Sequence, residues 1–118
     1  MAKLTRIAPE LPACDLSKAV AYYERILGFR MAMQMPDGQY AIVERDGAAI
    51  HLFQDHDRMR SPVAIHIFTT EIEALYDELH QKGAFLTQEI VRKPWGNRDF
   101  RVRDEFGNEL KFTEPLAE

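Results

Sequence analysis

Hydrophobic and polar positions alternate along several short segments of the chain, and this alternation predicts strands. In residues 48–53 and 63–68, aliphatic side chains alternate with two Ala-His-Phe triplets. Successive strand side chains point to opposite faces, so each segment has one aliphatic face and one face of small, imidazole and aromatic groups. The aliphatic faces are expected to pack against helices. The Ala-His-Phe faces, which carry His51, Phe53, His66 and Phe68, are candidate ligand walls, although both histidines can also be ordinary hydrogen-bonded residues of the core or rim.

Two other segments follow helical spacing. The first predicted helix covers Leu16–Leu27, with Asp15 as its N-cap and Gly28 at its end. The second begins at Thr70, and Glu73 completes a capping box with it. Each helix follows a short apolar strand and precedes three extended segments, so the two halves of the chain have the same order of elements.

This order predicts an α+β fold made of two βαβββ modules that form a cupped, mixed sheet. The remaining predicted strands are 30–35, 40–44 and 48–53 in the first half, and 85–91, 100–103 and 109–113 in the second. We expect one domain over residues 1–118, with a first module of about 1–57 and a second of about 62–118.

Composition narrows the classes of partner. The chain has 15 basic and 19 acidic residues and a formal net charge of -4, which argues against a nucleic-acid partner. No apolar stretch approaches the roughly 20 residues of a membrane-spanning helix, and the first residues do not resemble a signal peptide, so we expect no membrane partner and a cytoplasmic protein. Cys14 is the only cysteine, which excludes an internal disulfide and a cysteine metal cluster.

Three motifs carry a family resemblance. Residues 21–29 (AYYERILGF) and 104–108 (DEFGN) resemble the first-helix and late-turn signatures of the vicinal oxygen chelate superfamily, which contains glyoxalases, ring-cleaving dioxygenases and bleomycin resistance proteins. Residues 94–100 (PWGNRDF) look most like the bleomycin resistance branch. That resemblance implies a homodimer that exchanges its first strands, with Pro9 as the hinge, because proline within a strand is tolerated at an edge or a crossing point.

The enzymes of the superfamily hold a metal at four places, which the resemblance carries onto Ala8, His51, Ala64 and Lys111. A methyl group cannot ligate and a protonated lysine repels a divalent cation, so only His51 fits. We therefore expect no metal and no cofactor. The alternative is a displaced metal site in which His66 joins His51.

The resemblance then implies a metal-independent protein that sequesters a cationic antibiotic of the bleomycin type in crevices at a homodimer interface, rather than an enzyme. Two alternatives stay open: a divalent-metal-dependent lyase, isomerase or dioxygenase, and a binder of another planar metabolite or antibiotic. Arg98 can pair with a carboxylate of the ligand, or it can form a salt bridge with Asp99 or Asp104. The candidate ligand-binding residues are Met33, Tyr40, His51, Phe53, His66, Phe68, Trp95, Arg98, Phe100 and Lys111.

Overall fold

The computed structural model describes residues 2–56 and 63–115, and these form two similar halves. The first module consists of β1 (Glu10–Ala13), α1 (Leu16–Arg25), β2 (Arg30–Gln34), β3 (Tyr40–Arg45) and β4 (Ala48–Gln54). The second consists of β5 (Ala64–Phe68), α2 (Ile72–Gln81), β6 (Phe85–Arg92), β7 (Arg98–Arg103) and β8 (Glu109–Glu114). The predicted α+β class with two βαβββ modules is confirmed. The module boundaries expected near residues 57 and 62 lie outside the described residues.

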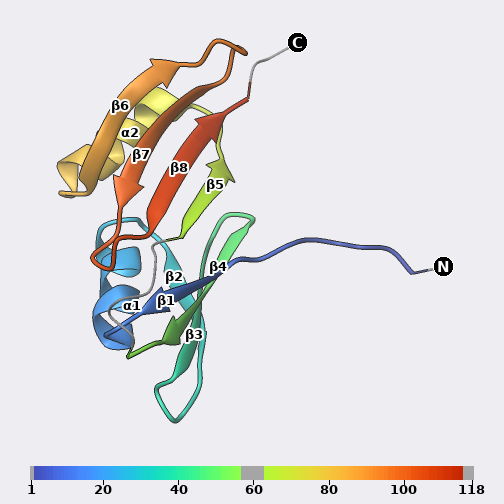
Figure 1. Cartoon of the computed structure of the whole chain (residues 1–118), viewed down its shortest axis with the longest axis vertical. Helices are drawn as coiled ribbons and strands as arrows, with labels where there is room; N and C mark the ends of the chain where they lie inside the picture. Colours follow the sequence, from blue (N-terminus) through green and yellow to red (C-terminus); the bar gives the residue numbers. More distant parts are fainter. Residues whose placement is uncertain (1, 57–62, 116–118) are drawn as a thin grey trace.

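The two modules have the same sheet topology (Figure 1). The strand orders are β1-β4-β3-β2 and β5-β8-β7-β6. In each sheet the first and last strands of the module pair in parallel, while the other pairs are antiparallel. Each helix packs on its own sheet, so one face of each sheet is covered and the other is left open.

The first helix begins as predicted, because its signal is local. The Asp15 side chain accepts a hydrogen bond from the Lys18 backbone N–H at 3.1 Å. The helix ends at Arg25, two residues earlier than predicted, and Gly28 turns the chain with a φ of +75°. This left-handed conformation favours glycine.

The capping box predicted for the second helix is wrong. Helix α2 begins at Ile72, and the preceding Glu71 adopts a left-handed φ of 51° without a side-chain cap. The Ile72 N–H instead donates to the Glu114 carboxylate at 3.2 Å, on the strand that follows much later in the chain. The Glu73 carboxylate pairs with Arg98, which also bonds Glu114. A cap supplied from β8 thus replaces the local cap.

The core lies between each helix and its sheet. Ile50 and Leu52 are buried on the helix-covered face of β4, as predicted for an aliphatic face. Phe100 is also completely buried, with ring centroids 5.2 Å from both Tyr76 of α2 and Phe112 of β8. The expectation that Phe100 lines a ligand wall is therefore wrong, because it lies on the helix side of its sheet.

The modules are joined by buried polar contacts around the turn before β8. Asn108 is almost completely buried, and its Nδ2 donates to Pro12 O and to Asp104 Oδ2, each at 3.0 Å. The same Asp104 oxygen accepts from the Tyr23 hydroxyl of α1 at 3.0 Å. Burial, and then the charge of Asp104, raise the pKa of Tyr23 well above its usual value.

A second connection between the modules lies at the surface of α2. Arg45, the last residue of β3, forms a two-pronged ion pair with Glu78, with both N–O distances at 2.8 Å. It also donates to Leu27 O at 2.8 Å. The hydrogen bond from Arg45 lowers the pKa of Glu78, since it favours the carboxylate.

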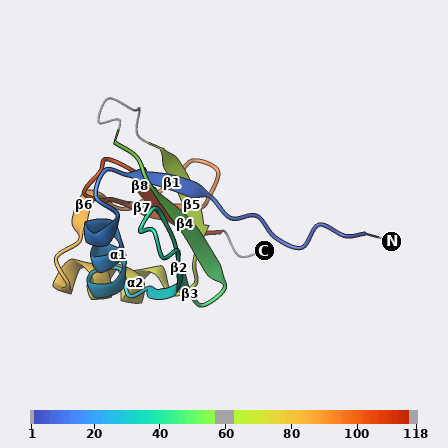
Figure 2. The same cartoon turned by 90° about the horizontal axis from the view of Figure 1, so that it is seen from below.

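Residues 2–8 leave the body of the molecule as an extended N-terminal arm, which Figures 1 and 2 show from two directions. The side chains of Leu4 and Ile7 are almost fully exposed. Pro9 lies just before β1 rather than inside it, and its carbonyl accepts from the His51 N–H at 3.0 Å. Of the described helices, neither has the length and apolar character needed to cross a membrane.

Candidate functional site

The open face of each sheet is crossed by a row of side chains that lie opposite one another on neighbouring strands. Paired residues on adjacent strands share a face, so the strand registers define these rows. In the first module the row runs from β1 to β2 through Glu10, His51, Ile42 and Met33. In the second module the equivalent row runs from β5 to β6 through His66, Lys111, Arg101 and Gln88. The two modules therefore carry different side chains at equivalent positions of their open faces.

In the first module, Tyr40 connects the polar members of the row. Its hydroxyl lies 2.7 Å from Glu10 Oε2 and 2.6 Å from His51 Nδ1. The hydrogen bond to Glu10 raises the pKa of Tyr40 above its usual value, because it stabilises the protonated phenol. Glu10 and Tyr40 thus orient the imidazole of His51. Phe53 lies opposite Tyr40 on β4, and both are half-buried.

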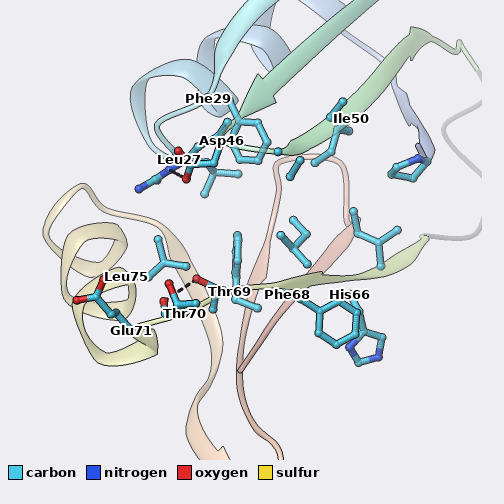
Figure 3. Close-up of a pocket in the computed structure, with 18 of the residues that line it drawn as sticks. Leu27, Phe29, Asp46, Ile50, His66, Phe68, Thr69, Thr70, Glu71 and Leu75 are labelled. Atoms are coloured by element: carbon cyan, nitrogen blue, oxygen red, sulfur yellow. Dashed lines mark hydrogen bonds and ion pairs between the residues drawn. The ribbon is translucent and has the colours of Figure 1, made fainter. Parts of the chain in front are cut away.

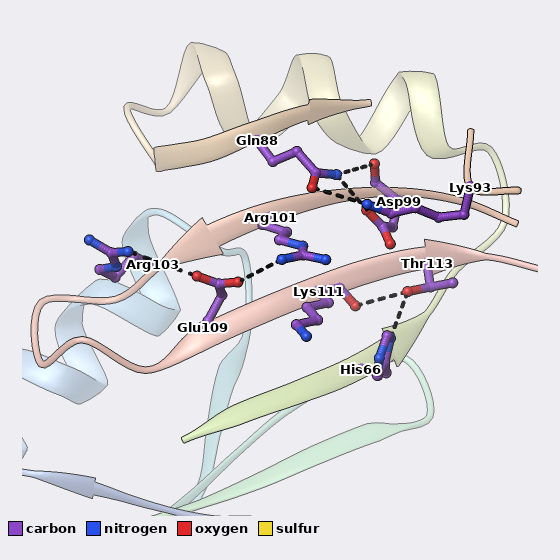
Figure 4. Close-up of polar contacts among 9 residues, drawn as sticks. All are labelled: His66, Gln88, Lys93, Asp99, Arg101, Arg103, Glu109, Lys111 and Thr113. Carbon is purple, nitrogen blue, oxygen red and sulfur yellow. Dashed lines mark hydrogen bonds and ion pairs between the residues drawn. The ribbon is translucent and has the colours of Figure 1, made fainter. Parts of the chain in front are cut away.

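In the second module, the open face is mainly polar and basic (Figure 4). Glu109 lies 3.4 Å from Arg101 and 3.9 Å from Arg103. Asp99 is buried, lies 3.8 Å from Lys93, and accepts a hydrogen bond from Gln88. Each carboxylate of this face therefore has a cationic neighbour.

Aromatic rings at the edge of this face are exposed. The His66 and Phe68 rings are nearly parallel, with an interplanar angle of 19° and centroids 6.2 Å apart. Phe68 is 67% exposed, and His66 Nδ1 lies 3.0 Å from Thr113 Oγ1. Trp95, in the loop between β6 and β7, is 69% exposed. These rings offer flat surfaces on which a planar molecule can stack.

The described structure gives Arg98 no free role on that wall. Its guanidinium bridges the carboxylates of Glu73 and Glu114, and these hydrogen bonds raise the pKa of Arg98 and lower those of both carboxyl groups. Arg98 therefore forms salt bridges, as one interpretation expected, but its partners are Glu73 and Glu114 rather than Asp99 or Asp104.

A cavity of about 570 Å³ lies between the two modules, beside β5. Its apolar wall includes Phe29, Ile50, Ile65 and Leu75. Figure 3 shows that the rings of His66 and Phe68 lie on the opposite side of the β5 strand from this wall. His66 and Phe68 also line the cavity, so it extends from this apolar wall to the Ala-His-Phe face of β5.

Sequence reasoning missed Arg101 and Gln88. The signal for Arg101 was present, since Asp99, Arg101 and Arg103 alternate with Phe100 and Val102. This alternation puts the charged residues on one face and the apolar ones on the other. Gln88 gave no comparable signal, because β6 contains irregularities between Leu86 and Val91 that shift its register.

The site has few groups that suit a divalent metal. Across residues 2–56 and 63–115, no three histidine, cysteine, aspartate or glutamate side chains converge to form a possible metal site. The row of the second module instead places Lys111 between His66 and Arg101. A positively charged ammonium next to a guanidinium does not fit a cation site.

The whole described arrangement corresponds to a known family. The family model of the Glyoxalase/Bleomycin resistance protein/Dioxygenase superfamily matches residues 3–112. The chain belongs to this superfamily.

Solved structures of this superfamily have the same fold. A bleomycin resistance determinant encoded on the transposon Tn5 superposes with a TM-score of 0.85 at 20% identity, covering 97% of this chain and 100% of that one. The bleomycin-binding protein of Streptomyces verticillus, solved with copper(II)-bleomycin, has a TM-score of 0.84 at 24% identity over the full length of both chains. Lactoylglutathione lyase from Agrobacterium tumefaciens has a TM-score of 0.77 at 19% identity, covering 96% of each chain. Both binding proteins and an enzyme thus share this fold.

Proposed function

We propose that the protein is a metal-independent binder that sequesters a planar small molecule, with a cationic antibiotic of the bleomycin type as the first ligand to test. The observation that carries this proposal is the exposed, nearly parallel ring pair of His66 and Phe68. It lies beside a row in which Lys111 and Arg101 disfavour a metal ion. Such a surface is suited to stacking and offers no obvious means of catalysis.

The relatives support the ligand class. The Streptomyces verticillus protein was solved with copper(II)-bleomycin and matches this chain over its whole length. The first module adds Tyr40, His51 and Phe53 as a second wall of the same kind, with Met33 at the far end of its row. Trp95 is exposed in a loop, where its ring is accessible to a ligand.

We also propose a homodimer in which the N-terminal arms, residues 2–8, are exchanged about Pro9. In the described chain the arm exposes Leu4 and Ile7, two large apolar side chains that gain by burial. Ile7 of the same chain lines the cavity between β4 and β5, so this cavity is also a suitable place for the equivalent side chain of a second copy. Deletion of residues 2–8 is expected to convert the dimer to a monomer in sedimentation equilibrium. An unchanged mass would contradict the exchange.

Titration with bleomycin tests the binding proposal directly. Quenching or enhancement of the fluorescence of Trp95, the only tryptophan, reports binding. Phe68→Ala is expected to weaken binding by about 5- to 150-fold, because a stacked ring contributes about 1–3 kcal/mol. Phe85→Ala is the matched control, since Phe85 is 62% exposed but lies at the opposite edge of the sheet. Equal effects of the two substitutions would contradict the proposed site.

Metal analysis separates the binder from the enzyme classes. Protein purified without chelators is expected to contain far less than one metal ion per chain. Stoichiometric iron, zinc, nickel or manganese would favour a metal-dependent lyase, isomerase or dioxygenase instead. The cytoplasmic location stays a prediction, which cell fractionation checks.

A further inference from the structure

The equivalent rows on the two open faces differ most in charge. The first module carries Glu10, His51, Ile42 and Met33, and the second carries His66, Lys111, Arg101 and Gln88. The second row therefore has two adjacent permanent cations and no carboxylate. This is notable in a chain whose formal net charge is -4.

The two cations are only partly neutralised by their surroundings. Among the described residues Arg101 makes a single ion pair, with Glu109 at 3.4 Å, and Glu109 also lies 3.9 Å from Arg103. The Nε of Arg101 is buried and has no hydrogen-bond partner among the described residues. Within residues 2–56 and 63–115, the Lys111 ammonium forms no ion pair. One glutamate is thus shared by two arginines, and the lysine beside them has none.

The remaining carboxylate of this face is already engaged. Asp99 lies one row further along β7, where it contacts Lys93 at 3.8 Å and accepts from Gln88 Nε2. Figure 4 shows Lys111 between the Arg101–Glu109 pair and His66. Four basic side chains, Lys93, Arg101, Arg103 and Lys111, therefore face two carboxylates, and the excess positive charge is centred on Lys111 and Arg101.

Two like charges on adjacent strands repel each other, and an anion placed between them relieves this repulsion. Adjacent strands lie about 4.8 Å apart, so one carboxylate or phosphate group can contact both side chains. From the row and its unpaired donors, we infer that Lys111 and Arg101, beside His66, bind an anionic group, a carboxylate or a phosphate, of the small molecule that the protein holds. This inference rests on the proposed function and specifies the charge of the ligand at this wall.

The position of His66 makes the inference more specific. The Thr113 hydroxyl donates to Lys111 O at 3.2 Å, so it accepts from the Nδ1–H of His66. This bond orients the imidazole, whose ring is stacked beside that of Phe68. A flat ring placed against His66 and Phe68 would thus have its substituent close to Lys111. The ligand expected at this wall therefore combines a planar ring with an anionic group close to Lys111, and the cationic groups of a bleomycin-type ligand would lie away from this row.

The test uses three probes with the same ring: 2-naphthoate, the neutral 2-naphthamide and the cationic 2-naphthylmethylammonium. Dissociation constants are measured by calorimetry, and the location of binding by NMR shifts of the Lys111 and Arg101 backbone amides. The carboxylate is expected to bind the natural protein at least tenfold more tightly than the amide, a difference of about 1.4 kcal/mol, and the ammonium most weakly. Raising the salt concentration should reduce the preference for the carboxylate.

Lys111→Met keeps most of the side-chain length and removes the charge, so it should abolish the preference for naphthoate over naphthamide. Lys18→Met is the matched control: it makes the same change of charge on the exposed side of α1 and should leave the preference intact. Equal affinities for the three probes, no binding of naphthoate, or a preference that survives in Lys111→Met would each overturn the inference.

Two further results separate this inference from the proposed function. If bleomycin binds but naphthoate does not, the proposed binding function is supported and the anion site is contradicted. In the opposite case, neither bleomycin nor naphthamide binds, but inorganic phosphate shifts the NMR signals of the Lys111 and Arg101 amides. If Lys111→Met removes these shifts, the anion site is supported and the proposed binding of planar molecules is contradicted.

Discussion

Replacement of Asn108 with aspartate keeps the shape of the side chain and removes both of its amide hydrogen bonds, of which the one to Pro12 joins the two modules. In the natural protein the Asn108 Nδ2 donates to Pro12 O and to Asp104 Oδ2, each at 3.0 Å, and the residue is 1% exposed. In Asn108→Asp, a carboxylate oxygen instead faces both acceptors. No cavity is created, so the effect reports on the hydrogen bonds and the charge.

The magnitude follows from the two acceptors that lose their donor. Pro12 O loses its Asn108 donor, which costs about 1–3 kcal/mol, while Asp104 Oδ2 keeps the Tyr23 hydroxyl and loses about 1–2 kcal/mol. Together these losses should lower the free energy of unfolding by about 2–5 kcal/mol at pH 7. At about 4 °C per kcal/mol for a domain of this size, the melting temperature should fall by about 8–20 °C. In Asn108→Asp the new carboxyl group lies next to that of Asp104, and repulsion between them favours binding of a proton. The loss of unfolding free energy should therefore become smaller as the pH falls.

Urea denaturation at a fixed protein concentration, followed by circular dichroism at pH 5 and pH 8, measures this effect. Asn108→Ala is the comparison, because it also removes both donors but adds no charge, and its loss should be nearly independent of pH. A loss below about 0.5 kcal/mol in Asn108→Asp, or an equal loss at both pH values, would refute the role assigned to the Asn108 amide.

Three further results are expected. Gly28→Ala should lower the free energy of unfolding by about 1–3 kcal/mol in urea denaturation, because the residue has a φ of +75° and a Cβ would lie 2.7 Å from Arg45 Nη1; an unchanged midpoint would show that the turn can relax. Since Arg45 lowers the pKa of Glu78, this pair contributes stability above pH 4.5 that is lost as the pH falls through the folded-state pKa of Glu78. Glu78→Gln should therefore be less stable at pH 7 and show a shallower acid dependence; an identical pH profile would contradict this. Trp95→Ala should weaken bleomycin binding by about 1–3 kcal/mol in calorimetry if the ring stacks on the drug, and unchanged affinity would place Trp95 outside the site.

Sequence predicted those parts of the fold whose signals are local. The Asp15 cap and the order of strands and helices follow from residues within one turn or one strand of each other. The start of α2 could not be predicted in the same way, because its cap comes from Glu114, 42 residues away. A local capping box between Thr70 and Glu73 fits the sequence equally well, but Glu73 pairs with Arg98 instead.

The candidate site was predicted less completely than the fold. The Ala-His-Phe alternation correctly indicated which face of β5 carries His66 and Phe68. Phe100 was assigned to a ligand wall because of its ring, although the alternation with Arg101 places it on the helix side. The contacts of Arg101 and Lys111 depend on which strands are neighbours. The strand order β5-β8-β7-β6 cannot be predicted from the residues of any one strand.

The different rows of the two modules have a consequence for the direction in which a molecule binds. If both rows were alike, a molecule lying between a first-module face and a second-module face could enter either way round. Here one wall presents Glu10, Tyr40 and His51, and the other presents Lys111 and Arg101. A ligand whose two ends differ in charge would therefore bind in a single orientation. A chemically symmetrical ligand would match at most one of the two walls.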